Sequence, residues 1–211
     1  MLTLYFSPGA CSTASHIGIE ECGATYTEHP VLIAKGDQKT PEYAKINPRG
    51  KVPALAVDGR IITENTAILT YLARLHPAAK LLPADPVDEA NCIATMAWFS
   101  NVVHPSYQRY MRAERFAEGD AAINNVKEMG KKSFWANLEE IDGLLAGKQW
   151  IMGDQFTVAD GYCLVFYGWG LRGELPMTKL ANYTAFKDRM LKRAAVQAVL
   201  AREQSILLTP D

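Results

Sequence analysis

The sequence carries almost no net charge and has no long uncharged apolar run. Its 22 Lys and Arg residues nearly balance 23 Asp and Glu residues, which gives a formal net charge of -1. Such a chain lacks the basic surface of a protein that binds nucleic acid or an anionic membrane. No stretch approaches the roughly 18 apolar residues of a membrane span, and the N-terminus lacks the basic start and apolar core of a signal peptide. We therefore expect a cytoplasmic protein with no nucleic-acid partner and no membrane partner.

Cysteine is also scarce, and its spacing excludes a disulfide framework. The four cysteines among 211 residues are irregularly spaced, which fits a reducing compartment. Cys11 is followed by Ser12, Thr13 and Ala14, so it lacks the C-x-x-C motif of a dithiol oxidoreductase. Only exchange with an external thiol remains open to it. The four histidines share no metal-ligand spacing, so we expect no metal site and no bound cofactor.

The first 75 residues read as a small α/β domain. A β-prone run, LTLYF, is followed by a helix-compatible segment that ends at Gly23 and by a second β-prone run, TYTEHPVL. In one sheet this order implies parallel strands joined by a right-handed crossover. The runs PALAV and RIIT, separated by Asp58-Gly59, predict an antiparallel hairpin with a type I′ turn. Residues 64–75 then carry the pattern of an amphipathic helix.

Three prolines within residues 76–90 break any periodic element and indicate a domain boundary. Four later segments can be written as helices with apolar faces, at 88–113, 120–146, 157–171 and 184–203. The third begins with a capping box formed by Thr157 and Asp160, and its apolar residues on all sides predict a buried central helix. We therefore expect an N-terminal domain at 1–77, a linker at 78–87 and an all-α domain at 88–211.

Cys11 lies between the first strand and the first helix, where a helix N-terminus favours a thiolate. That effect is about 0.3 to 1 kcal/mol, whereas one pKa unit corresponds to about 1.36 kcal/mol. The helix end alone would therefore leave the thiol mostly protonated, and a second donor is needed. His104 is a candidate for it, and the alternative is that a histidine beside Pro105 only marks a helix kink. The other cysteines lie in apolar helical patterns and read as core residues: Cys22, Cys92 and Cys163.

Two further segments have the character of a ligand cradle. Pro53 opens a strand and holds Val52 extended, so that the backbone of Val52 can pair with an extended peptide ligand. The alternative is an ordinary strand-initiating proline. At Glu64 and Asn65 polar groups crowd a helix start, where a ligand carboxylate can take free N–H groups and Glu64 can take an amine. The alternative there is a self-contained helix cap.

Four motifs occur in order along the chain: SPGACS at 7–12, INPRGKVPAL at 46–55, TENTAILTYLA at 63–73 and FTVADGY at 156–162. Together they resemble the bacterial cytosolic glutathione transferases, especially the beta class and its close relatives. The resemblance implies a thioredoxin-like N-terminal α/β domain with a mixed sheet that binds glutathione. It also implies an all-α C-terminal domain with a hydrophobic co-substrate site, and a homodimer.

Carried over by position, the resemblance implies the residues that bind glutathione. Val52, before a cis Pro53, would pair its backbone with the peptide. Glu64 and Asn65 would hold the γ-glutamyl end, and Lys35 is a weaker match for a contact to the glycyl end.

The resemblance also places Cys11 and His104 at the glutathione sulfur. In the beta class the matching cysteine can form a mixed disulfide with glutathione. The chain departs from the beta pattern at Pro105, where those enzymes carry a lysine, so one cationic contact is missing. Tyr5 and Ser12 are alternative donors to the sulfur, because tyrosine-type and serine-type transferases use such hydroxyl groups.

These residues predict a glutathione transferase that stabilises the glutathione thiolate and conjugates it to a small hydrophobic electrophile. The candidate residues for the electrophile site, for each of which a core role is the alternative, are Tyr107, Tyr110, Met111, Tyr167 and Trp169. Two other functions stay open. One is a glutathione-dependent thiol transferase or peroxidase that works through a Cys11 mixed disulfide, and the other is a non-catalytic ligand-binding or interaction module on the same fold.

Overall fold

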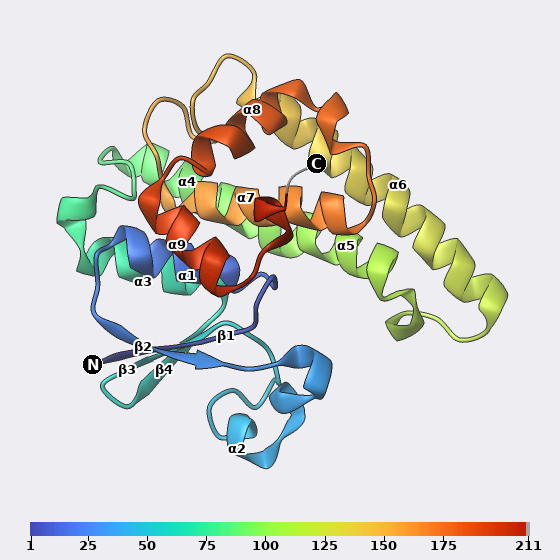
Figure 1. The fold of residues 1–211 in the computed structure, drawn as a ribbon, viewed down its shortest axis with the longest axis horizontal. Helices are drawn as coiled ribbons and strands as arrows, with labels where there is room; N and C mark the ends of the chain where they lie inside the picture. Colours follow the sequence, from blue (N-terminus) through green and yellow to red (C-terminus); the bar gives the residue numbers. More distant parts are fainter. Residues whose placement is uncertain (210–211) are drawn as a thin grey trace.

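The computed structural model describes residues 1–209 and has the predicted architecture, a small α/β region followed by an all-helical region (Figure 1). The α/β region contains a four-stranded mixed sheet and the helices α1 (Thr13–Glu21), α2 (Pro41–Ala44) and α3 (Asn65–Leu75). The helical region begins with α4 (Pro86–Trp98) and ends with α9 (Ala194–Arg202), which a short 3-10 turn follows. Within the described residues, no helix is both long enough and apolar enough to cross a membrane.

The sheet has the strand order β2-β1-β3-β4, from β1 (Leu2–Phe6), β2 (Tyr26–Pro30), β3 (Ala54–Val57) and β4 (Arg60–Thr63). β1 is parallel to β2 and antiparallel to β3, with Leu4 opposite Glu28 on one side and opposite Leu55 on the other. β3 and β4 form the predicted hairpin, in which Asp58 and Gly59 have φ of 48° and 83°. Positive φ at both positions is what a type I′ turn requires, so this prediction is confirmed.

The two faces of β1 have different neighbours. Leu2, Leu4 and Phe6 alternate along the strand and pack with apolar residues of α1 and α3. Tyr5 points to the opposite face, where it lies against Tyr43 of α2. Helix α1 also packs against α7 and α9 of the helical region (Figure 1). The loop between β1 and α1 is thereby held where the two regions meet.

The segment predicted as one helix at 88–113 follows a continuous helical path, but its winding changes. α4 runs into a π-helical turn at Phe99–Val103, and α5 (His104–Met111) follows at once. Pro105 has no N–H to donate to the preceding turn, and a wider turn just ahead of it absorbs that loss. The π-helical turn therefore sets the direction in which the His104 side chain projects from the helix.

Helices α6 (Asp120–Leu145) and α7 (Val158–Arg172) occupy the predicted segments, and α7 is buried along almost its whole length. The predicted capping box is present. The Asp160 carboxylate accepts from Thr157 N at 2.7 Å and also from Ile151 N at 2.8 Å. Burial raises the pKa of Asp160 to about 7, against the effect of these hydrogen bonds. Asp160 is therefore a structural residue, as expected.

The prediction of one helix at 184–203 is wrong, because the chain forms α8 (Ala181–Met190) and then α9 after a break. Arg193 is extended in that break, with φ of -80° and ψ of 128°. Its guanidinium makes two hydrogen bonds to the Glu21 carboxylate of α1, at 2.6 and 2.7 Å. The spacing of apolar residues in the segment does not predict this ion pair between distant residues.

Candidate functional site

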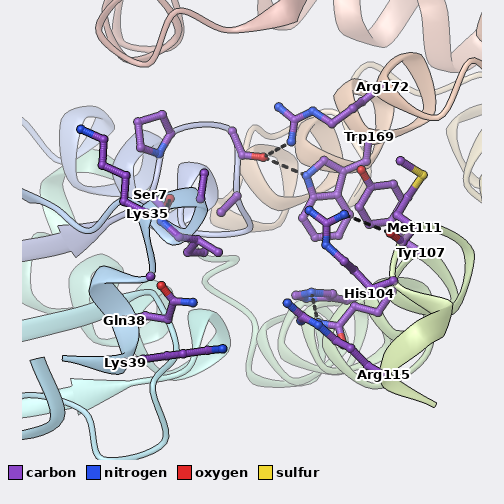
Figure 2. Close-up of a pocket in the computed structure, with 18 residues that line it drawn as sticks. Ser7, Lys35, Gln38, Lys39, His104, Tyr107, Met111, Arg115, Trp169 and Arg172 are labelled. Atoms are coloured by element: carbon purple, nitrogen blue, oxygen red, sulfur yellow. Dashed lines mark hydrogen bonds between the residues drawn. The ribbon is translucent and has the colours of Figure 1, made fainter. Parts of the chain in front are cut away.

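The α/β region and the helical region enclose a cleft made of two adjoining cavities. The inner cavity, of about 420 Å³, is lined by Cys11, Val52 and His104 among others. The outer cavity, of about 640 Å³, shares His104 and Trp169 with the inner one and extends along residues 7–10. Figure 2 shows side chains of the two regions facing each other across this cleft. Cys11 and His104, which come from different regions, therefore line one cavity, as predicted.

Cys11 is a half-buried thiol that donates a hydrogen bond. Its Sγ donates to the Val52 carbonyl at 3.4 Å, and its own carbonyl accepts from Asn65 Nδ2 at 3.0 Å. Burial raises the pKa of the Cys11 thiol to about 12, the Glu64 carboxylate adds to the rise, and Lys51 opposes it. Cys11 is therefore a neutral thiol at physiological pH, which makes it a hydrogen-bond donor and a poor nucleophile.

His104 is the second donor of the inner cavity. Its Nε2 lies 2.9 Å from the amide nitrogen of Gln108, and its ring meets Trp169 edge-on with centroids 4.8 Å apart. Burial lowers the pKa of His104 to about 4, and the nearby Lys51 acts in the same direction. The ring is therefore neutral at physiological pH. Because the Gln108 amide donates to Nε2, the ring proton is on Nδ1, which can donate to a ligand.

Lys51 supplies a cation in place of the lysine that is absent at Pro105. The departure from the beta pattern at Pro105 removes a lysine from α5. Lys51, on the loop before β3, lies close enough to Cys11 and His104 to lower the pKa of both. The inner cavity therefore has a cation beside its two neutral donors, although it comes from the α/β region instead of the helical one.

The backbone at Val52 forms another part of the inner cavity. The Val52–Pro53 peptide bond is cis, as the resemblance implied. The preceding carbonyl, of Lys51, accepts from the Tyr43 hydroxyl at 2.6 Å and from Asn47 Nδ2 at 2.8 Å, which fixes the loop. Among residues 1–209, no backbone or side-chain acceptor pairs with the Val52 N–H. Val52 lines the inner cavity, so its unpaired N–H is a candidate donor for an extended peptide, and its carbonyl accepts from the Cys11 thiol.

The start of α3 differs from its predicted role. Asn65 is buried, its Oδ1 accepts from Ser15 Oγ at 2.7 Å, and its Nδ2 donates to the Cys11 carbonyl. This side chain therefore holds the cysteine loop in place, and the predicted contact of Asn65 with the γ-glutamyl end would have to use its backbone N–H. Glu64 is exposed at the N-cap with φ of 71° and remains a candidate for the amine.

The structure does not bring the two predicted hydroxyl donors to the sulfur site. Tyr5 lies on the far face of the sheet, with its ring 4.7 Å from that of His29, and lines a different cavity. Ser12 is fully buried, donates to the Ser7 carbonyl at 3.1 Å and accepts from Ser7 N at 2.9 Å. Because neither Tyr5 nor Ser12 lines the inner or the outer cavity, both predictions need correction.

Three of the predicted electrophile-site residues line the outer cavity: Tyr107, Met111 and Trp169. The rings of Tyr107 and Trp169 are stacked with centroids 4.3 Å apart. The other two are core residues. The Tyr110 hydroxyl donates to the Gly173 carbonyl at 2.7 Å, and Tyr167 is buried with its hydroxyl 3.0 Å from Thr184 Oγ1.

The outer cavity is also far more basic than predicted. Lys35, the candidate for the glycyl end, lines this cavity and not the inner one, and in Figure 2 its side chain points away from the middle of the cleft. Four further cations, missed in the sequence, line the same cavity: Lys39, Arg112, Arg115 and Arg172. Arg112 and Arg115 lie three residues apart directly after a helix, which is a weak indication in the sequence of a shared basic surface. No local pattern indicates that Arg172 lies there.

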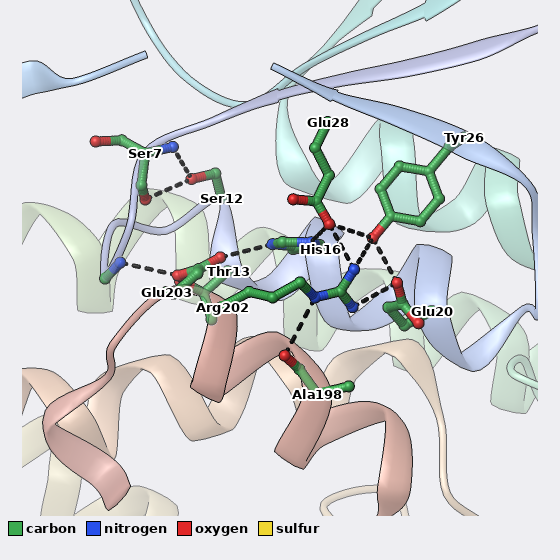
Figure 3. A network of polar contacts seen from close by, with 11 residues as sticks. Ser7, Ser12, Thr13, His16, Glu20, Tyr26, Glu28, Ala198, Arg202 and Glu203 are labelled. Atoms are coloured by element: carbon green, nitrogen blue, oxygen red, sulfur yellow. Dashed lines mark hydrogen bonds and ion pairs between the residues drawn. The ribbon is translucent and has the colours of Figure 1, made fainter. Parts of the chain in front are cut away.

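The loop at residues 7–10 is held by the helical region. The Gly9 carbonyl accepts from Trp169 Nε1 and from Arg172 Nη1, each at 3.0 Å. The Gly9 N–H donates to the buried carboxylate of Glu203 at 2.9 Å, and the same carboxylate accepts from Thr13 Oγ1 at 2.6 Å (Figure 3). Both backbone polar groups of Gly9, in the cysteine loop, are thus fixed from the other region.

The chain is similar to known proteins over almost its whole length. Residues 9–75 match the family model "Glutathione S-transferase, N-terminal domain". Glutathione S-transferase GstA of Escherichia coli O157:H7 is 32% identical, over 96% of this chain and 98% of that protein. A glutathione transferase homologue from Sulfitobacter, solved with bound glutathione, is 32% identical with a TM-score of 0.90, and 96% of this chain and 98% of that chain are covered. The bacterial beta class enzyme of Sphingomonas chungbukensis is 32% identical with a TM-score of 0.85, covering 95% and 98%.

Proposed function

Because the chain belongs to the glutathione S-transferase family, we propose that it binds glutathione in the inner cavity and conjugates it to a small electrophile held in the outer cavity. The cysteinyl backbone of glutathione would pair with the N–H and the carbonyl of Val52. Glu64 would take the γ-glutamyl amine, and the cations of the inner cavity would take the carboxylates.

The glutathione sulfur would be activated by three groups. His104 supplies one neutral donor, Cys11 supplies a second once its S–H turns from the Val52 carbonyl to the glutathione sulfur, and Lys51 supplies positive charge. Donors that favour the thiolate over the thiol lower its pKa. The thiol proton leaves to water, the sulfur lone pair forms a C–S bond to the electrophile, and the leaving group departs with the electrons of the broken bond. Catalysis is then positioning and electrostatic stabilisation.

The raised pKa of Cys11 is the observation that favours this function over a thiol transferase or peroxidase. Attack on a disulfide needs a thiolate, and burial keeps the Cys11 thiol protonated. A neutral thiol can still donate a hydrogen bond to the thiolate of glutathione. The absence of a C-x-x-C motif agrees with this reading.

Binding and turnover test the proposal together. We expect free glutathione at about 100 times its Kd to raise the free energy of unfolding by about 2.7 kcal/mol, measured by chemical denaturation. Conjugation of glutathione to 1-chloro-2,4-dinitrobenzene should be followed by absorbance under the same conditions. Stabilisation without turnover of any electrophile would favour the non-catalytic binding module. No stabilisation at all would refute both.

Cys11→Ala is expected to lower kcat/KM for conjugation by about three- to ten-fold, because a thiol is a weak donor and His104 and Lys51 remain. The pKa of bound glutathione, read from the pH dependence of kcat/KM for the electrophile at saturating glutathione, should rise. Cys11→Ser keeps a donor of similar size and should recover most of the rate. Complete loss of conjugation in both variants would instead assign Cys11 a covalent role.

We further propose a homodimer in the cytosol, as the resemblance implied. The four free thiols agree with a reducing compartment. Light scattering on the purified protein measures the assembly directly, and a monomer at micromolar concentration would contradict it.

A further inference from the structure

The outer cavity carries more positive charge than a pocket for a neutral apolar molecule requires. Two lysines and three arginines line it, namely Lys35, Lys39, Arg112, Arg115 and Arg172. Its lining includes no aspartate or glutamate. The chain as a whole has a net charge of -1. A cleft lined by one sign of charge raises the local concentration of the opposite sign. The cavity therefore favours an anionic occupant.

These cations form no ion pair with a carboxylate of the described residues. In the part of the chain that the structure describes, none of the five has a carboxylate oxygen within 4.0 Å. Arg112 donates only to the neighbouring Met111 carbonyl at 3.1 Å, and Arg172 donates to the Gly9 carbonyl. A guanidinium has five N–H donors, so both retain donors for a ligand carboxylate.

Arg112 and Arg172 both lie near Tyr107. Burial raises the pKa of Tyr107, and both arginines lie near enough to its hydroxyl to oppose that rise. Tyr107 is in turn stacked on Trp169, and both largely buried rings line the outer cavity together with the two arginines. Figure 2 shows Trp169, Tyr107 and Arg172 together on the helical side of the cleft.

The charge of glutathione itself does not account for these two arginines. Arg112 and Arg172 line the outer cavity but not the inner one. The inner cavity has cations of its own that the outer one lacks, Arg49 and Lys51. Lys39 and Arg115 line both cavities, so they do not discriminate between the two ligands.

From this arrangement we propose that the electrophile is a carboxylic acid with a flat apolar body, whose body lies on Tyr107 and Trp169 and whose carboxylate is bound by Arg112 and Arg172. The inference rests on the proposed function, since it names the substrate class of the same site. The substrate class thereby changes from the predicted hydrophobic electrophile to an amphipathic anion.

The test uses two electrophiles that differ only in the acid group, 4-chloro-3,5-dinitrobenzoate and its methyl ester. In both, the glutathione thiolate forms a C–S bond at the chlorine-bearing carbon, and chloride leaves with the electrons of the C–Cl bond. Each kcat/KM, at saturating glutathione, is divided by the rate constant of the uncatalysed reaction at the same pH, which removes the difference in intrinsic reactivity. We expect the normalised value for the acid to exceed that for the ester by about ten-fold.

Arg112→Gln is expected to lower kcat/KM for the acid by about three- to ten-fold, with the loss mainly in KM, and to change that for the ester by less than about two-fold. Arg112→Lys keeps the charge and should restore part of the loss. Arg60→Gln, on the exposed β3–β4 hairpin outside both cavities, is the matched control and should alter neither substrate. Raising the ionic strength from about 0.01 to about 1 M should weaken the preference for the acid, because it shortens the Debye length from about 30 to about 3 Å.

Equal normalised values for acid and ester, or an equal loss of both in Arg112→Gln, would overturn the inference while leaving the transferase function intact. A protein that neither binds glutathione nor converts the ester would overturn the proposed function first. Thermal denaturation of each variant shows whether it is folded, so a loss confined to the acid cannot come from misfolding.

Discussion

Glu203→Gln is expected to lower the free energy of unfolding by about 2 kcal/mol, a loss typical of weakening buried hydrogen bonds to a carboxylate. The Glu203 carboxylate is fully buried and accepts from Gly9 N at 2.9 Å, Thr13 Oγ1 at 2.6 Å and His16 Nδ1 at 2.8 Å (Figure 3). A glutamine amide turns one of these acceptor positions into a donor. If the amide nitrogen faces Gly9 N and Thr13 Oγ1, these groups lose their acceptor, and if it faces His16, the ring must change its tautomer. Urea denaturation followed by circular dichroism measures the loss.

The matched control is Glu28→Gln, which alters the other carboxylate that contacts the same histidine. Glu28 Oε1 lies 3.3 Å from His16 Nε2, but the Glu28 side chain is 32% exposed. Water can replace the lost contact there, so we expect a loss of about 1 kcal/mol or less. Equal losses in the two variants would show that the burial of Glu203 does not set the strength of this network.

The Glu203 variant should also bind glutathione more weakly, because Glu203 holds the N–H of Gly9 in the loop that carries Cys11. Titration calorimetry with glutathione measures the change in Kd. The Glu28 variant leaves this loop untouched and should keep the Kd of the unaltered protein. A purely structural role for Glu203, confined to α1 and α9, would leave the Kd of both variants unchanged.

Features that depend on neighbours in the chain were predictable. The turn at Asp58-Gly59 needs two positive φ values, which Gly and Asp accept at low cost, and the hairpin is present. The capping box of Thr157 and Asp160 joins residues three apart, and it too is present. The long helix α6 follows from periodicity alone.

Features that depend on distant residues were not predictable. Gly9 and Glu203 are 194 positions apart, and Gly9 and Arg172 are 163 apart, so no local pattern could join them. The break before α9 has the same origin, since Arg193 leaves the helix to meet Glu21 across 172 positions. The motif around Asn65 was identified, but only packing decides whether its side chain faces a ligand or the Cys11 carbonyl.

Methyl methanethiosulfonate is expected to modify Cys11 in the native protein about fifty-fold more slowly at neutral pH than in the unfolded chain. A rise in its pKa from 9.0 to about 12 lowers the thiolate fraction about a thousand-fold. The more basic thiolate is about twenty-fold more nucleophilic, which offsets part of that loss. Mass spectrometry of the peptide that contains Cys11, sampled over time, separates this thiol from the other three. The unfolded chain in urea provides the reference rate.

The pH dependence of this reaction discriminates between the two roles of Cys11. A thiol with a pKa of about 12 should react about ten-fold faster for each pH unit between about 7 and 10, with no plateau, because its thiolate fraction is still rising. Lys51→Met removes the cation that opposes the rise in pKa, so that variant should react more slowly still. A plateau below about pH 9 would instead indicate a thiolate at physiological pH. Cys11 would then be able to exchange with a glutathione disulfide, and the thiol transferase alternative would displace the conjugating enzyme proposed above.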